Sequence, residues 1–348
     1  MEKDFLIIGG GIAGSVLAIK LMDEGYSVDL VDNHFKENAS KIAAGMINPV
    51  NFKRMITCWN AEDFLSNCIP FYKNLEEKWD VSFLNNVRLA KLMNSEHENE
   101  LWQEACRKEA TKDYLNPEYI SEDYKELFQF DFAVGEVNNL YQLDTGVFLK
   151  AVQQLLSDSD SLIKDDIKHS DLEISEDSVS WKGNAYGRVI FAEGMGVSKN
   201  PFFNYLPFKA TKGELIKVKT DFDIKHTIKK NIFFHPEGNN EYWVGATYDW
   251  SDLTWETSEK GRQDLLDKLE KIVKFDFKVT DHKAGVRPTV KDRRPYLGQH
   301  PEHSQLYVFN GLGTRGVMMA PLLADHFISL LKDKNPLMQE VDIQRVKG

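Results

Sequence analysis

The first thirty-two residues constrain the fold of this chain more than any other segment. An apolar run at Phe5 to Ile8 precedes GGGIAG at 9–14, apolar residues at helical spacing up to Gly25, and SVDLVD at 27–32. Strand, glycines, helix, strand and acid in this order are typical of a nucleotide-binding βαβ unit. The helix N-terminus would offer its N–H groups to a pyrophosphate. The unit therefore predicts a bound adenine dinucleotide, but by itself it does not distinguish NAD from FAD.

Each of the glycines and the acid in this unit has a physical task. We expect Gly9 to permit the tight turn, Gly11 to let the backbone approach the pyrophosphate, and Gly14 to let the helix pack close to the strand. Asp32 ends the second strand, where a carboxylate can accept the ribose hydroxyls of adenosine.

Charge and composition make several classes of partner unexpected. The 348 residues include 43 Lys and Arg and 54 Asp and Glu, for a net charge of −11. An acidic surface repels phosphate backbones and anionic lipids, so we expect neither nucleic acid nor membrane as a partner. The length is enough for about two domains.

Cysteines and histidines give no sign of a disulfide framework or a metal site. Cys58, Cys68 and Cys106 form no CxxC pair, and the nine histidines fall in no HxxxH or HExxH pattern. We expect reduced, buried thiols and no metal. The apolar N-terminus lacks the basic n-region and cleavage motif of a signal peptide, so we expect a cytoplasmic protein.

Three later segments favour FAD over NAD. ENASKIAAGMINPV at 37–50 is a loop of small residues, with a helix start capped by Ser40 as the alternative; RVIFAEG at 188–194 is a strand ending in small residues. In LYVFNGLGTRGVMMAPLLADHFISLL at 306–331, a strand leads through glycines into a helix whose N-terminus could face an anion. A ligand long enough to contact both ends of the chain would explain this repetition.

These segments resemble those of the D-amino-acid oxidase superfamily of FAD-dependent amine oxidoreductases, which includes glycine oxidase and sarcosine oxidase. GGGIAG…VDLVD, ASKIAAGMINP, AGVRPTVKDRRPYLG (284–298) and GLGTRGVMMAP are similar to four signatures of that family. RRPYLG and LGTRG are most similar to the oxidase half of the bifunctional enzyme that modifies the wobble uridine of tRNA. The methyltransferase half of that enzyme is absent from this sequence.

The resemblance implies an α/β fold: a Rossmann-like FAD-binding domain from residues 1–60, 141–206 and 285–348, and a mostly antiparallel-sheet substrate domain from 61–140 and 207–284. Residues 61–140 read as mostly helical, whereas 207–284 read as strands around a GNN hairpin turn and a helix. The sequence also predicts a helix over 143–156 with Asp144 as its N-cap.

The resemblance further implies non-covalent FAD, because no cysteine follows Cys106 to attach the flavin. Asp32 stands where the family usually has Glu, and Glu193 stands among residues that are usually small. The residues expected to contact FAD are Gly9, Gly11, Ile12, Ala13, Gly14, Asp32, Asn33, Ser40, Lys41, Ala44, Gly45, Met46, Ile167, Ala192, Glu193, Gly194, Arg287, Gly313, Thr314, Arg315, Gly316, Val317 and Met318.

The resemblance implies oxidation of the C–N bond of a small amino acid or secondary amine, by hydride transfer to flavin N5 and hydrolysis of the imine. Arg287 stands at the family's carboxylate-binding arginine, with a salt bridge to an acid such as Asp292 as the alternative. Arg315, Tyr248 and His235 are further candidates around the substrate. Trp243 is expected to pack in the core, and Trp250 and Trp255 could form a wall.

Two other functions stay open at this stage. One is an oxidase acting on an amine attached to a larger molecule such as modified tRNA. The other is a non-catalytic protein that binds FAD and acts through a partner. The sequence specifies neither the electron acceptor, oxygen or another compound, nor the oligomeric state.

Overall fold

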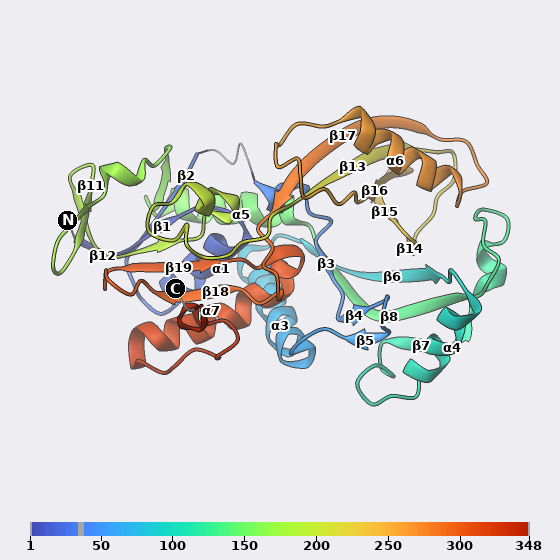
Figure 1. The fold of residues 1–348 in the computed structure, drawn as a ribbon, viewed down its shortest axis with the longest axis horizontal. Helices are drawn as coiled ribbons and strands as arrows, with labels where there is room; N and C mark the ends of the chain where they lie inside the picture. Colours follow the sequence, from blue (N-terminus) through green and yellow to red (C-terminus); the bar gives the residue numbers. More distant parts are fainter. Residues whose placement is uncertain (1, 34–37, 347–348) are drawn as a thin grey trace.

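The computed structural model describes residues 2–33 and 38–346, which form two β-sheets in two adjoining lobes (Figure 1). The first lobe holds both ends of the described chain. Its eight-stranded sheet contains β1 (Glu2–Ile8), β2 (Val28–Asp32), β9 (Leu162–Lys164), β10 (Glu173–Ile174), β11 (Val179–Trp181), β12 (Asn184–Phe191), β18 (Tyr296–Gln299) and β19 (Leu306–Asn310).

The centre of the first sheet is parallel and buried on both faces. β1 lies between β2 and β12, and β9 and β19 extend the parallel pairing on either side. Phe5 and Ile7 face one apolar cluster, and Leu6 and Ile8 face the other, as expected for a strand covered on both sides. The Rossmann-like arrangement expected from the N-terminal segment is confirmed.

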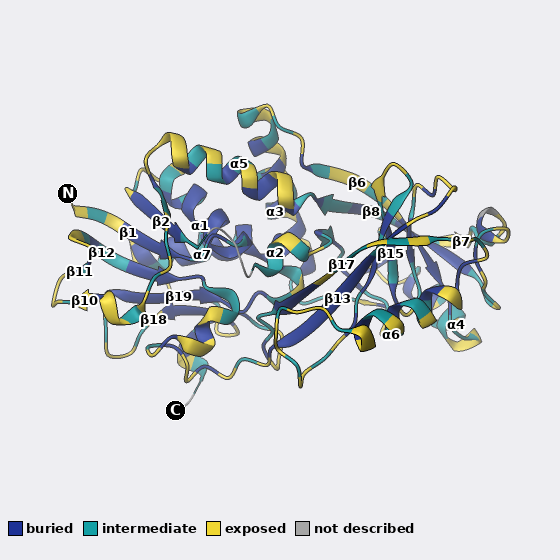
Figure 2. Cartoon of the chain, turned by 90° about the horizontal axis from the view of Figure 1, so that it is seen from above, coloured by how far each residue is buried: buried dark blue, intermediate teal, exposed yellow. Residues whose placement is uncertain are grey.

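Four helices cover one face of this sheet: α1 (Ile12–Asp23), α3 (Ala61–Trp79), α5 (Thr145–Asp158) and α7 (Gly316–Asp333). α1 is buried along nearly its whole length because it lies against the sheet on one side and other helices on the other (Figure 2). The predicted N-cap of α5 is present, since Asp144 Oδ1 accepts a hydrogen bond of 2.9 Å from the Val147 N–H.

The second sheet has nine strands, and all neighbouring pairs except β6 and β14 are antiparallel. Its order is β17-β13-β16-β15-β14-β6-β8-β3, and β7 pairs with β8. The bounds are β3 (Met46–Ile47), β6 (Leu84–Leu92), β7 (Leu115–Tyr119), β8 (Val134–Leu143), β13 (Thr211–Lys219), β14 (Thr227–Lys229), β15 (Phe233–Gly238), β16 (Glu241–Gly245) and β17 (Lys278–Arg287).

The prediction that residues 61–140 are mostly helical was correct for α3 and α4 (Glu96–Ala105) but wrong for the rest of the segment. β6 and β8 form a long antiparallel pair there, and their exposed positions carry polar residues that weaken the apolar pattern of a strand. The other elements are α2 (Ala39–Ile42), α6 (Glu259–Glu270) and a hairpin of β4 (Val50–Asn51) and β5 (Ile56–Thr57). The predicted domain boundaries stay a proposal; most strands divide between the two sheets as proposed, but β3, within the predicted 1–60 segment, pairs with β8 of the second sheet.

Candidate cofactor and substrate site

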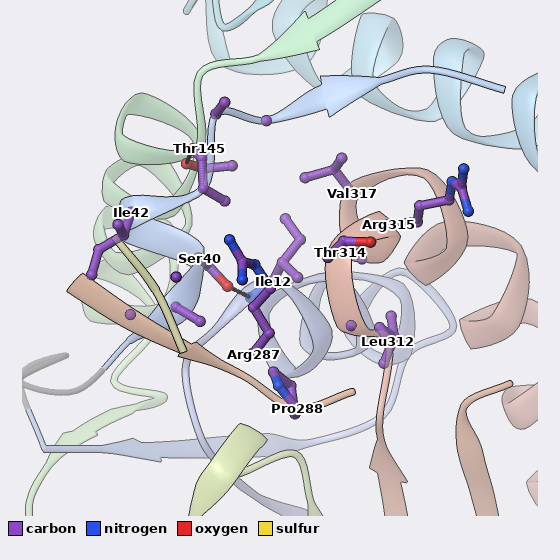
Figure 3. A pocket seen from close by; sticks show the side chains of 18 of the residues that line it. Ile12, Ser40, Ile42, Thr145, Arg287, Pro288, Leu312, Thr314, Arg315 and Val317 are labelled. Carbon is purple, nitrogen blue, oxygen red and sulfur yellow. Dashed lines mark hydrogen bonds between the residues drawn. The ribbon is translucent and has the colours of Figure 1, made fainter. Parts of the chain in front are cut away.

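A cavity of about 600 Å³ extends from the glycine turn after β1 to one face of the second sheet (Figure 3). It gathers most of the residues singled out in the sequence. Those that line it are Gly9, Gly11, Ile12, Ala13, Asp32, Asn33, Ser40, Ala44, Gly45, Met46, Ala192, Glu193, Gly194, Tyr248, Arg287, Gly313, Thr314, Arg315, Gly316 and Val317.

The turn between β1 and α1 leaves no room for side chains. Gly9 has φ +108°, and a Cβ there would lie 2.6 Å from the backbone oxygen of Ala192. A Cβ on Gly14 would lie 2.0 Å from the Gly9 oxygen, so Gly14 packs behind the turn and does not itself line the cavity. The turn is thus a bare-backbone cradle of the kind a pyrophosphate requires.

Side chains from two other segments hold this cradle in place. The Gly10 N–H donates to Asp32 Oδ2 at 2.7 Å, and the Ile12 N–H donates to Ser40 Oγ at 3.0 Å. Ser40 lies inside the short helix α2, whose N-cap is Asn38, and therefore does not cap its own helix. The alternative interpretation of Ser40 as a plain helix cap was wrong.

The N-terminus of α7 meets that of α1 at the same cavity. A Cβ on Gly316 would lie 2.9 Å from Ile12 Cγ2, and no side chain caps either helix at its N-cap residue. Two positive helix ends from opposite ends of the chain therefore face one cavity, as an elongated anionic cofactor requires.

Five predicted site residues lie away from the cavity lining: Gly14, Lys41, Ile167, Met318 and His235. Met318 is 1% exposed within the helix core, and Ile167 packs on the opposite face of the first sheet. Lys41 lies on the exposed side of α2. Glu193 lines the cavity, but its carboxylate is held by His169 Nε2 at 2.8 Å and by Asn200 Nδ2 at 2.7 Å.

His235 lies one layer behind the cavity. It is 5% exposed, and its Nδ1 is 2.7 Å from Oγ1 of Thr227, which lines the cavity. Burial lowers the pKa of His235 to about 4. His235 therefore supports a lining residue, and a direct contact with substrate stays a prediction that this position disfavours.

One face of the second sheet forms the opposite wall of the cavity. Side chains alternate along each strand, and paired residues share a face. Leu215, Gly245, Phe233 and Lys229 are aligned across β13, β16, β15 and β14, and all four line the cavity. The opposite face carries an apolar cluster that includes Ile216, Val244, Phe234 and Ile228.

Arg287 ends β17 on the cavity face, and its side chain extends into the cavity (Figure 3). Its Cζ lies 4.9 Å from the centroid of the Tyr248 ring. A Cβ on Gly213, in the neighbouring strand, would lie 2.0 Å from Arg287 Nη2, so glycine there makes room for the guanidinium.

The guanidinium of Arg287 is buried without a full set of partners. Nη1 has no hydrogen-bond acceptor among the described residues, and burial lowers the pKa of the group. The alternative salt bridge to Asp292 was wrong, because Asp292 pairs with Arg345 Nη1 at 2.7 Å. A buried cation of this kind is stabilised by an incoming anion.

The aromatic residues near the cavity divide into two groups. Trp255 and Tyr248 line the cavity, and Trp250 stacks on Tyr248 with the ring centroids 6.4 Å apart. Trp243 is only partly buried, between Lys217 and Lys283, so the expectation of a core position was wrong.

The sequence interpretation missed the cavity-facing residues of β13, β14 and β15, notably Gly213, Thr227, Lys229 and Phe233. Alternation within each strand indicates which residues share a face. It does not indicate which face meets the cofactor domain, and the strand order needed for that depends on long-range pairing.

Comparison with known proteins identifies the family. The family model described as DAO, FAD dependent oxidoreductase, matches residues 4–330. The chain belongs to this family. It is therefore an FAD-dependent oxidoreductase, and the residues around the cradle fit FAD, since the turn is bare backbone and neither N-cap residue, Gly11 of α1 or Arg315 of α7, caps its helix with a side chain.

Two kinds of curated relative are similar to this chain. Glycine oxidase of Bacillus subtilis is 26% identical and covers 94% of this chain and 93% of its own length. The tRNA 5-methylaminomethyl-2-thiouridine biosynthesis bifunctional protein MnmC of Idiomarina loihiensis is 24% identical and aligns with 100% of this chain but 59% of its own length. The chain thus spans little more than half of such bifunctional relatives.

Solved structures share the fold at low identity. Glycine oxidase from Geobacillus kaustophilus has a TM-score of 0.82 at 20% identity, with 100% of both chains covered. Iminodiacetate oxidase from Chelativorans sp. BNC1 has a TM-score of 0.79 at 18% identity, covering 97% of this chain and 98% of that one.

The described part of the chain contains neither a candidate cluster of metal ligands nor a candidate membrane-spanning helix. No group of three or more histidine, cysteine, aspartate or glutamate residues there could hold a metal ion. None of the helices described is both long and apolar enough to cross a bilayer. Cys58, Cys68 and Cys106 are free, but only Cys68 is buried, so the expectation of three buried thiols was wrong for the other two.

Proposed function

We propose that this enzyme oxidises the C–N bond of a small amino acid or N-substituted glycine whose carboxylate is bound by Arg287. The observation that most supports this proposal is that the Arg287 guanidinium lines the cavity and that its buried Nη1 has no hydrogen-bond acceptor among the described residues. Arginine binds a carboxylate through two parallel hydrogen bonds, which fixes the orientation of the substrate.

The other residues of the second sheet would position the substrate. Tyr248 would hold the guanidinium from one side, while Phe233, Leu215 and Leu89 form an apolar wall that excludes water. FAD, held non-covalently by the cradle, would accept hydride from the carbon that bears nitrogen, and water would hydrolyse the resulting imine. The main task of the protein side chains is then to orient the substrate and shield it from solvent.

The experiment is an anaerobic titration of the FAD-loaded enzyme with glycine, sarcosine and longer N-alkylglycines, following loss of the flavin absorbance. We expect at least one of these amines to bleach the flavin. Arg287→Met should raise the KM for it by an order of magnitude or more, since a charged hydrogen bond is worth about 1.5–3 kcal/mol. Arg262→Met, on the outer side of α6, is the matched control. An unchanged KM in Arg287→Met would refute the carboxylate role.

A second candidate is oxidation of an amine attached to RNA. Tyr248 and Trp250 are 60% and 58% exposed beside the cavity and stack on each other, which suits a base-stacking platform. The similarity to tRNA 5-methylaminomethyl-2-thiouridine biosynthesis proteins favours an RNA-linked substrate, whereas the net charge of −11 opposes binding of RNA. A salt-sensitive shift of tRNA that is lost in Trp250→Ala would support this candidate.

A further inference from the structure

The wall of the cavity formed by the second sheet is cationic, although the protein as a whole is acidic. Lys53, Lys229, Arg287 and Arg293 line the cavity, and Lys229 and Arg287 belong to strands of the second sheet. The acidic residues that line the cavity are Asp32 and Glu193, and both belong to the first lobe. A wall that carries cations and no acid, in a chain of net charge −11, is suited to an anionic ligand.

Lys229 is the most unusual member of this wall. It is half-buried at the end of β14, and no hydrogen bond or ion pair joins its ammonium to any other described residue. Its partner across the strands is Lys91, which is 2% exposed and already bound to Glu98 Oε2 at 2.6 Å and to the Leu92 oxygen at 2.8 Å. Glu98 therefore neutralises Lys91, and Lys229 has no such partner among the described residues.

The surroundings of Lys229 leave its charge uncompensated. Burial, and then the charge of Lys91, lowers the pKa of Lys229 to about 8. A partly buried ammonium without a counter-ion costs free energy, and an anion in the cavity would offset that cost.

Lys229 and Arg287 lie at opposite ends of the cavity wall. β13, β16 and β15 separate β17 from β14, which amounts to roughly 19 Å across the sheet at about 4.8 Å per strand. Lys229 is aligned through Phe233, Gly245 and Leu215 with Lys283, and Arg287 lies further along β17, where its guanidinium extends over Gly213 of the neighbouring strand. Two cations joined by an apolar floor fit a ligand with an acid at each end and an aliphatic chain between.

We propose that Lys229 forms a second anion subsite, and that the preferred substrate is a glycine whose nitrogen carries an aliphatic chain ending in a carboxylate. The inference rests on the proposed function for the position of the first carboxylate, at Arg287. The hairpin of β4 and β5 carries Asn51 and Lys53 to the same corner, since Val50 and Met55 pack with Leu89 of β6. Lys53 is exposed and would close the subsite from the solvent side.

The test uses matched pairs of ligands with the FAD-loaded protein. N-carboxypropylglycine and N-carboxypentylglycine are each compared with the N-alkylglycine of equal chain length. Calorimetry measures the Kd of each ligand, and anaerobic bleaching of the flavin is recorded separately. We expect wild type to bind at least one acid-tailed ligand about tenfold or more tightly than its neutral partner.

Lys229→Met keeps most of the side-chain volume and should abolish the preference for acid-tailed ligands over neutral ones. Lys229→Arg should restore part of this preference. Lys230→Met is the control, because Lys230 is the adjacent half-buried lysine and does not line the cavity. Loss of the preference in Lys229→Met but not in Lys230→Met would support the subsite.

The two proposals can fail separately. If no amine bleaches the flavin but the Lys229-dependent preference is present, the proposed function falls and the anion subsite stands. If amines bleach the flavin but wild type shows no preference for the acidic tail, or Lys229→Met retains it, the subsite is overturned and the proposed function stands.

Discussion

The guanidinium of Arg287 lies over the ring of Tyr248, with 4.9 Å between Cζ and the ring centroid. Tyr248 is 60% exposed, so the ring covers a buried cation from the solvent side. The aromatic face attracts the charge without occupying its hydrogen-bond donors. The donors of Arg287 thus remain directed toward an acid in the cavity.

Two substitutions of Tyr248 should distinguish the contribution of its aromatic ring to ligand binding from that of its hydroxyl. Tyr248→Phe keeps the aromatic face, and we expect less than a twofold change in the Kd of a carboxylated ligand. Tyr248→Leu removes the face and should raise that Kd about threefold to tenfold, since an exposed cation–π contact is worth about 0.5–1 kcal/mol or somewhat more. Calorimetry on both variants checks this, and equal effects in the two would contradict it.

Gly213 should be as important to ligand binding as a contact residue. A methyl group there would lie 2.0 Å from Arg287 Nη2, so Gly213→Ala must displace the guanidinium. We expect the KM of a carboxylated substrate to rise about tenfold, as after partial loss of a charged hydrogen bond. The Kd of FAD should be unchanged. Gly146→Ala in α5, where the nearest atom to the new Cβ is 3.3 Å away, serves as the control.

Ser40→Ala should weaken FAD binding. The hydroxyl of Ser40 accepts the Ile12 N–H at 3.0 Å and so fixes the start of α1 beside the cradle. Loss of one such hydrogen bond is worth about 0.5–1.5 kcal/mol, which corresponds to roughly a twofold to tenfold higher Kd. Titration of the apoprotein with FAD measures this Kd. Ser66→Ala removes an exposed hydroxyl on α3 and should leave the Kd unchanged.

His235 should make the free energy of unfolding depend on pH. Burial lowers its pKa to about 4, below the ordinary value of 6.5, so the unfolded state takes up a proton first as the pH falls. Its contribution to the free energy of unfolding is complete above pH 6.5 and is lost between about 6.5 and 4, by roughly 3 kcal/mol. The comparison is urea unfolding of wild type and His235→Gln at pH 7.5 and 4.5.

The expected result is that the stability difference between wild type and His235→Gln shrinks or reverses at the lower pH. His97 is exposed on α4, so His97→Gln should show no such change. A difference that is the same at both pH values would show that His235 does not titrate on unfolding.

The sequence predicted most reliably what local chemistry determines. Gly9 and the elements around it have the expected places because a strand, a bare turn and the start of a helix are specified within a few residues. Asp144 caps α5 for the same reason. β6 escaped prediction because its sequence, LNNVRLAKL, alternates imperfectly and reads as polar.

The features that the sequence did not predict depend on pairing between distant segments of the chain. The partner of Ser40 is in α1, and the position of Lys229 follows from the pairing of β14 with β15 and β6. Neither is encoded in a short window of sequence. Ile167 and Met318 were expected at the cofactor by resemblance alone, but Met318 lies in the helix core and Ile167 packs, partly buried, on the opposite face of the first sheet.

The parallel pairing of β14 with β6 has a consequence for synthesis of the chain. Until residues 227–229 have left the ribosome, β6 presents an open backbone edge on the side away from β8. A nascent chain stalled within the intervening segment should therefore be prone to aggregate through that edge, and the second lobe can mature only when both of its distant halves have been translated.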